Sequence, residues 1–330
     1  MSQDVPLGPD DVGRRVSVRR QVGERDGRPQ LTDVLGVLEA VSEVTLVIRR
    51  GNGAVVDVPR QDVTAFRRVA DTPPVRAART AEQWTDLELE QVAWTGWPGL
   101  EQEHLGGWVL RAANGFTGRA NSALPLTDPG VPTEAAIAHV VDFYDARGLH
   151  PRFQVPTPLA LPLDERLEAL GWTVLDPVDV MTADVERVLT GTAPIPDVPP
   201  LLVDPAPDAG WLDAYHYRGG ALPAHAVAVI TAGAGPAFAS VRDDTGSVLA
   251  IARAAVSQGW AGITAVEVAE HARRRGLGTH VMRELVAWAG RQGARHAYLQ
   301  VARENTPALG LYGRMGFFAH HGYHYRLAPE

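Results

Sequence analysis

One segment, residues 263–288, constrains this chain more than any other, because it joins a strand to a helix through a glycine-rich turn. Residues 263–268 read Ile-Thr-Ala-Val-Glu-Val, and this β-branched composition is typical of a strand. Apolar residues then recur at the spacing of a helix with one buried face, at Leu277, Val281, Leu285 and Trp288. The order strand, turn, helix brings free backbone N–H groups and the positive end of the helix dipole to one point, which suits a diphosphate.

The turn and a later segment form two motifs in a fixed order. The turn reads Arg273-Arg274-Arg275-Gly276-Leu277-Gly278-Thr279, and its glycines let an anion approach the main chain where a Cβ would stand. Residues 305–317 follow as Asn-Thr-Pro-Ala-Leu-Gly-Leu-Tyr-Gly-Arg-Met-Gly-Phe. A glycine pair before a helix is by itself common turn chemistry, so the second motif is what adds specificity.

Together the two motifs, Arg-x-x-Gly-x-Gly and Asn-x-x-Ala-x-x-Leu-Tyr-x-x-x-Gly-Phe, resemble the GNAT superfamily of acyl-CoA-dependent N-acyltransferases. The resemblance covers residues 201–330 well and the rest faintly. It implies an α+β fold, a mixed sheet with flanking helices. It also implies acetyl-CoA as co-substrate and no metal. The acceptor would be a small molecule or peptide whose primary amine attacks acetyl-CoA directly in a ternary complex.

The resemblance also implies roles for single residues. The backbone N–H of Val268 is expected to stabilise the oxyanion. Tyr312 is expected to protonate the leaving thiolate, because the pKa of a phenol, about 10, is close to the pKa of an alkyl thiol. The residues expected to contact acetyl-CoA are Val266, Val268, Arg273, Arg274, Arg275, Gly276, Leu277, Gly278, Thr279, Asn305, Ala308 and Tyr312.

The base that takes the proton of the acceptor amine stays open. Glu267 is next to the oxyanion donor, although strand alternation would allow its side chain to turn away from the acceptor. The histidines in regions that wall the acceptor pocket in this superfamily are His216, His225, His320, His321 and His324. Each is more commonly a packing or surface residue, and a chain of water molecules would also suffice.

Composition excludes several classes of function. The sequence contains no cysteine, so it has neither a disulfide framework nor a thiolate metal site. It contains no lysine, so an enzyme that carries acetyl-CoA would have no lysine side chain of its own to acetylate. A formal charge of −8 argues against general nucleic-acid binding. Without an apolar stretch of about 18 residues or a signal-peptide layout, we expect a cytoplasmic protein, monomeric or weakly dimeric.

Residues 1–70 are predicted to form a small all-β, SH3-like barrel. Short alternating strands, including 44–48 and 55–58 around the glycine-rich residues 51–53, indicate this fold. The segment holds 11 arginines against 10 acidic residues, a net charge of +1, so a packing appendage is favoured over a recognition module. Consecutive prolines at 73 and 74 mark a linker.

Residues 80–190 are predicted to be a degenerate copy of residues 200–330, a tandem pseudo-repeat. Gly148 and Gly171 lie 23 residues apart, as do Gly293 and Gly316. The middle copy lacks the expected cofactor residues: the positions matching Arg273, Gly276, Gly278 and Tyr312 hold Asp128, Val131, Thr133 and Leu167. We expect one competent acyl-CoA site, with the two copies packed as one body.

Two other functions remain possible at this level. One is a non-catalytic acyl-CoA sensor, against which the presence of Tyr312 argues. The other is a dinucleotide-binding Rossmann enzyme, which would need a third glycine in the turn and leaves the second motif without a role.

Overall fold

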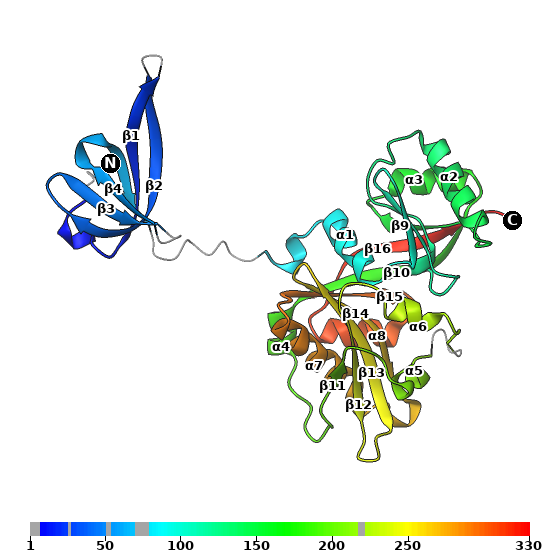
Figure 1. Ribbon diagram of the computed structural model, residues 1–330. Coiled ribbons are helices and arrows are strands. Elements are labelled where there is room, and N and C mark those ends of the chain that lie inside the picture. The colour runs from blue at the N-terminus through cyan, green and yellow to red at the C-terminus, as the bar shows by residue number, and fades with distance from the viewer. Residues whose placement is uncertain (1–6, 26–27, 51–53, 70–78, 217–221) are drawn as a thin grey trace. The chain divides into compact units, whose positions relative to one another are not determined.

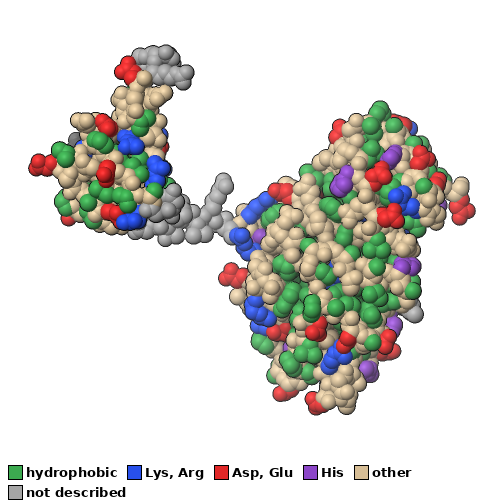
Figure 2. Space-filling view, in the orientation of Figure 1, with side chains coloured by type: hydrophobic (Ala, Val, Ile, Leu, Met, Phe, Trp, Pro, Cys, Tyr) green, Lys and Arg blue, Asp and Glu red, His purple; other side chains and the backbone are tan. Residues whose placement is uncertain are grey.

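The computed structural model describes residues 7–25, 28–50, 54–69, 79–216 and 222–330. The chain divides into two compact units, Met1–Ala78 and Arg79–Glu330 (Figure 1). The predicted loop at 51–53 and the prolines at 73 and 74 lie outside the described residues. Among the described helices, none has the length and apolarity needed to cross a membrane. On the face drawn in Figure 2, basic side chains stand among acidic ones in both units.

The first unit is all-β, as predicted. Its strands pair antiparallel in the order β4-β3-β2-β1-β5. Alternating apolar residues of these strands, such as Val16, Val18 and Ile48, are fully buried in one core. The strands are β1 (Arg15–Arg25), β2 (Arg28–Val41), β3 (Thr45–Arg49), β4 (Val55–Pro59) and β5 (Val63–Arg68).

We expect residues 79–330 to fold without the first unit. The hydrophobic clusters of each unit draw only on that unit's described residues. Calorimetry of a fragment starting at Arg79 should therefore give an unfolding midpoint within a few degrees of the corresponding transition in the full chain. A fragment that is insoluble or lacks a cooperative transition would contradict this expectation.

The second unit is built on an eight-stranded sheet in the order β11-β12-β13-β14-β15-β10-β16-β9. Every neighbouring pair is antiparallel except β14 and β15, which are parallel. The strands are β9 (Arg152–Thr157), β10 (Thr173–Asp184), β11 (Leu202–Asp204), β12 (Pro236–Arg242), β13 (Val248–Ser257), β14 (Trp260–Val268), β15 (His296–Ala302) and β16 (Phe318–Leu327). A smaller sheet contains β6 (Glu101–Leu105), β7 (Trp108–Ala112) and β8 (Leu124–Pro125).

Helices accompany both halves of this sheet (Figure 1). The predicted amphipathic helix is α7, and its apolar face, including Val281 and Leu285, is buried in the largest core cluster of the unit. The helices are α1 (Asp86–Gly96), α2 (Thr133–Asp145), α3 (Leu161–Ala169), α4 (Val185–Gly191), α5 (Ala209–Ala214), α6 (Ala226–Ile230), α7 (Leu277–Arg291) and α8 (Thr306–Arg314).

The two halves of the second unit repeat one order of elements. The series α2, β9, α3, β10 corresponds to α7, β15, α8, β16. The matched glycines have positive φ at the same turns: 62° at Gly148 and 94° at Gly293, then 80° at Gly171 and 92° at Gly316. Glycine is favoured there because other residues rarely adopt this conformation.

The halves share their sheet by exchanging strands. Each half's last strand pairs with the other half's preceding strand, β10 with β15 and β16 with β9, and the two last strands pair with each other. The ranges 80–190 and 200–330 thus each contribute strands to one sheet. We propose that these two ranges are the two repeats.

Candidate active site

The two parallel strands β14 and β15 separate and leave a cleft between them. Their paired register runs only from Trp260 opposite His296 to Ile263 opposite Leu299. Beyond this point lies a hollow of about 320 Å³. It is lined by Tyr215, His216, residues 263–267, residues 299–302, Asn305 and Tyr312.

A β-bulge in β14 accompanies the separation. Ile251 of β13 is opposite Glu267, whereas Arg253 is opposite Thr264, so β14 carries one extra residue between these pairs. Ala265 lies within this interval and has a φ of 52°, a left-handed conformation that is uncommon for alanine. The bulge bends β14 where its pairing with β15 ends.

The direction of the backbone N–H groups at the end of β14 follows from its pairing with β13. The N–H of Ala269 donates to the carbonyl of Leu249 in β13 at 2.9 Å. Because successive N–H groups of a regular strand alternate in direction, that of Val268, which lies beyond the bulge, points away from β13, to the side where the pairing with β15 has ended. The Val268 N–H is thus directed away from β13 and is not used in that strand pairing.

The glycine-rich turn has the geometry of an anion cradle. Arg274 and Gly276 have φ values of 62° and 78°, and Gly276 is the N-cap residue of α7. A Cβ added at Gly276 would lie 3.4 Å from the Ile195 side chain. The first N–H groups of this 15-residue helix have no partners within the helix, and Arg274 and Arg275 are exposed. The turn therefore fits a diphosphate.

Tyr312 of α8 lines the cleft and is buried, with 8% of its surface exposed. Its ring contacts Phe317, with the centroids 6.1 Å apart. Burial raises the pKa of Tyr312 to about 12. The phenol therefore keeps its proton at physiological pH, but it is a weaker acid than the ordinary value of about 10 would make it.

Two residues of the second motif have structural contacts of their own. The side-chain oxygen of Asn305 accepts a hydrogen bond from the N–H of Ala308 at 3.2 Å and so caps α8. Asn305 also lines the cleft. Ala308 packs against the main core cluster.

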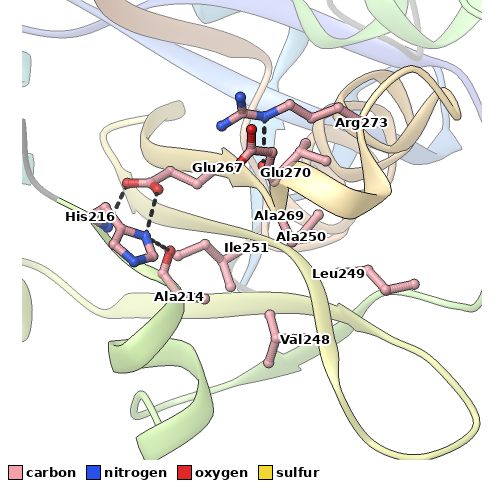
Figure 3. A pocket seen from close by; sticks show the side chains of 11 residues that line it. Ala214, His216, Val248, Leu249, Ala250, Ile251, Glu267, Ala269, Glu270 and Arg273 are labelled. Carbon is pink, nitrogen blue, oxygen red and sulfur yellow. Dashed lines mark hydrogen bonds and ion pairs between the residues drawn. The ribbon is translucent and has the colours of Figure 1, made fainter. Parts of the chain in front are cut away.

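The structure brings together two of the candidate bases, Glu267 and His216 (Figure 3). The backbone N–H of His216 donates to one carboxylate oxygen of Glu267 at 2.9 Å, and its ring Nδ1 is 3.5 Å from the other oxygen. Burial raises the pKa of Glu267 above its ordinary value, despite the opposing effect of the His216 hydrogen bond. Glu267 lines the cleft and also a second hollow of about 450 Å³ beside it, which extends to Arg273.

The other four candidate histidines line neither of these hollows. His225 is the N-cap residue of α6, and its ring is 6.4 Å from that of Phe116. His324 contacts the carboxylate of Asp164 at 2.7 Å. His320 and His321 contact residues of α1 and its N-terminal flank.

A third hollow, of about 560 Å³, adjoins the cleft and was not predicted as a whole. Tyr215 and Ala302 line both, and Arg119 of the middle copy donates a hydrogen bond to Gln300 in the cleft wall at 2.8 Å. The third hollow is lined by residues 117–119, residues 176–178, Tyr215, Ala302, Glu304 and Tyr325. Thr117, Gly118 and Arg119 bring the middle copy into the wall of this hollow.

Comparison with known families covers both units. The model of the "Probable histone acetyltransferase Rv0428c C-terminal" family matches residues 87–326. The model of the "Rv0428c N-terminal Sm-like domain" matches residues 10–67, in agreement with a small all-β unit.

Individual proteins give the same result. The chain is 33% identical over 326 residues to the "Probable histone acetyltransferase Rv0428c" of Mycobacterium tuberculosis, covering 96% of this chain and 95% of the relative. It is 30% identical to the "Uncharacterized N-acetyltransferase YobR" of Bacillus subtilis, covering 73% of this chain and 97% of that protein.

Among solved structures, the fold is similar to that of a GCN5-related N-acetyltransferase from Kribbella flavida. The TM-score is 0.51 at 17% identity, over 70% of this chain and 90% of that one. A tandem GNAT protein from the clavulanic acid biosynthesis pathway gives a TM-score of 0.50 at 15% identity, over 63% and 76% of the two chains.

Proposed function

This chain belongs to the GNAT-type N-acetyltransferase family that includes Rv0428c, and from that premise we propose that it transfers the acetyl group of acetyl-CoA directly to a primary amine. The observation that supports this most is the separation of β14 from β15, which leaves the end of β14 and the Tyr312 side chain beside one cleft. The glycine-rich turn at the start of α7 also supports the proposal, because its backbone conformation and the N-terminal N–H groups of the helix suit a diphosphate.

The residues proposed to hold acetyl-CoA fall into three groups. The turn and the start of α7 bind the diphosphate, the end of β14 binds the thioester end, and α8 borders the cofactor arm. They are Val266, Val268, Arg273, Arg274, Arg275, Gly276, Leu277, Gly278, Thr279, Asn305, Ala308 and Tyr312. Asn305 would contribute through the helix N-terminus that it caps as well as through its side chain.

The proposed reaction needs a base, an oxyanion donor and an acid. A neutral amine attacks the thioester carbonyl, so that an N–C bond forms and the C–S bond breaks. The N–H of Val268 donates to the carbonyl oxygen as it becomes negative. The amine proton passes to Glu267, directly or through water, and the departing thiolate takes the phenolic proton of Tyr312.

The third hollow is proposed as the acceptor site. Asp176 and Glu304 line it, and carboxylates favour an acceptor that arrives as a cation. One relative is named a probable histone acetyltransferase, which supports including lysine-containing basic peptides among the acceptors tested. We expect a monomer or a weak dimer, because β9 of the middle copy already pairs with β16, the last strand of the chain.

Replacing Glu267 by Gln is expected to lower turnover about 10²-fold or more, the usual contribution of a general base. Because burial raises its pKa, wild-type activity should fall at a higher pH than an ordinary glutamate would give, as the carboxylate gains a proton on acidification. Rates are measured across pH with two acceptors whose amines differ in pKa. A loss of activity that shifts with the amine pKa belongs to the acceptor, and one that stays at the same pH belongs to Glu267.

The matched control is His216→Ala, which keeps the backbone N–H on Glu267 and removes only the ring. Its turnover should stay within a few-fold of wild type. If Glu267→Gln retained both the rate and the acidic limb, water would be the proton acceptor and Glu267 would have no catalytic role.

The function itself is tested by thiol release from acetyl-CoA over a panel of small amines, amino sugars and basic peptides. Mass spectrometry should find one acetylated amine for each thiol released. Tight acetyl-CoA binding without release on any acceptor would favour the non-catalytic sensor.

A further inference from the structure

A cluster of two histidines and one aspartate lies in the second unit where the start of α1 meets β16. Nδ1 of His320 is 2.9 Å from Nδ1 of His321 and 3.4 Å from a carboxylate oxygen of Asp86. The same oxygen is 3.9 Å from Nδ1 of His321. The side chains of His320, His321 and Asp86 are 7%, 1% and 26% exposed. None of these residues has a part in the proposed acetyl transfer.

A β-bulge explains how neighbouring residues of one strand face each other. His321 is opposite Val180 of β10 and Ala319 is opposite Met181, so His320 is an extra residue in β16. Successive side chains of a regular strand point to opposite faces, whereas a bulge redirects one of them. Both imidazoles therefore turn toward the same helix, α1.

The start of α1 positions the third group. Thr85 and Glu88 form a capping box: the Thr85 side chain accepts from the Glu88 N–H, and Glu88 accepts from the Thr85 N–H at 2.8 Å. This arrangement begins α1 at Asp86 and places Glu90 one turn later on the same side of the helix.

The outer nitrogen of each ring faces an acceptor. Nε2 of His320 is 2.8 Å from the carbonyl oxygen of Trp84, and Nε2 of His321 is 2.8 Å from a carboxylate oxygen of Glu90. The other carboxylate oxygen of Glu90 accepts from Gln154 at 3.3 Å. A carbonyl and a carboxylate only accept hydrogen bonds, so both Nε2 atoms carry the hydrogen.

This assignment leaves each Nδ1 atom without a hydrogen and with a lone pair. The two Nδ1 atoms lie 2.9 Å apart, beside the carboxylate of Asp86. Two lone pairs at that distance repel unless a positive charge lies between them. The charge is either one additional proton or a metal ion. Asp86 favours the metal ion over the proton. A metal ion is held by several donor atoms that converge on one point, whereas a proton shared between two nitrogens needs no third donor.

From this geometry we propose that Asp86, His320 and His321 bind one divalent transition-metal ion, with Zn²⁺ the best match. Imidazole and carboxylate are common Zn²⁺ ligands, and bonds of about 2.0–2.2 Å hold tetrahedral donor atoms about 3.3–3.6 Å apart. The distances between the donor atoms, 2.9, 3.4 and 3.9 Å, surround that value. Trp84 and Glu90 orient the two rings from outside, as partners of metal-bound histidines do.

The ion would join the first helix of the second unit to its last strand. Its fourth coordination position would hold water. The expected consequence is a metal-dependent gain in the stability of the second unit, because an ion that binds only the folded form stabilises that form by mass action.

The test uses the full chain without a histidine tag, treated with EDTA and then dialysed against Zn²⁺. Elemental analysis should find one Zn²⁺ per chain, and Co²⁺ in its place should give the visible absorption of a tetrahedral site. Zn²⁺ should raise the midpoint of thermal unfolding. His320→Gln and Asp86→Asn should lose the bound metal, and Glu90→Gln should weaken binding about 10–100-fold.

The matched control is His324→Gln, on the same strand, since His324 contacts Asp164. It should keep one Zn²⁺ per chain. Wild type without stoichiometric metal would overturn the proposal and leave a shared proton in the site. Equal binding by wild type, Asp86→Asn and His320→Gln would also overturn it, because the metal would then lie elsewhere. The wild-type measurements decide the question even if a variant fails to fold.

Discussion

Tyr312→Phe should lower turnover about 10²–10⁴-fold and leave acetyl-CoA affinity almost unchanged. The substitution removes only the phenolic oxygen, so the ring keeps its place in the cleft and its contact with Phe317. A thiolate that leaves without a proton donor must take its proton from water. Because burial raises the pKa of Tyr312 to about 12, wild-type activity should not fall through ionisation of this phenol below that pH.

Steady-state rates and calorimetric titration with acetyl-CoA measure the two effects separately. The matched control is Tyr298→Phe, a buried tyrosine of β15 whose hydroxyl donates to the carbonyl of Ala93 at 3.3 Å. It should lose some stability and keep its turnover. If Tyr312→Phe kept turnover within about threefold of wild type, the proton would come from another group.

Gly276→Asp should weaken acetyl-CoA binding by up to about 10³-fold. At an effective dielectric constant of about 20, a like charge about 4 Å from the diphosphate costs about 4 kcal/mol. The substitution also adds a Cβ in contact with Ile195 and places a side chain at a φ of 78°. The charge and these steric effects must therefore be separated.

Gly276→Asn separates them, because asparagine has the shape of aspartate without its charge and tolerates positive φ. We expect its dissociation constant to rise only a few-fold, with thermal unfolding similar in the two variants. Equal affinity in Asp and Asn variants would mean that the diphosphate does not bind near Gly276.

Local sequence patterns predicted the parts of the fold that neighbouring residues determine. The helix that begins at Leu277 and the turn glycines within each copy follow from residues close together in the chain, whereas the place of Tyr312 was expected from the family resemblance. The pairing of β10 with both β15 and β16 was not predicted in detail, because strand exchange depends on contacts between distant segments. Periodicity within a segment carries no information about its partner strand.

In the candidate site too, local sequence patterns did not reveal contacts between distant segments. Glu267 and His216 were separate candidates, and their contact depends on where the chain leaves α5. Regular strand alternation would place His320 and His321 on opposite faces, and the bulge that brings them together arises from pairing with β10. Asp176 likewise reaches the third hollow beside a register shift in β10.

The most direct test of the proposed acetyl transfer uses isotopically labelled acetyl-CoA with one identified amine. Direct attack in a ternary complex predicts label on the amine, equal to the thiol released, and no labelled protein when the amine is omitted. Because the chain has neither lysine nor cysteine, side-chain background acetylation is small and intact-protein mass spectrometry gives a clear answer. Label that accumulates on the protein without amine and then passes to it would contradict the account.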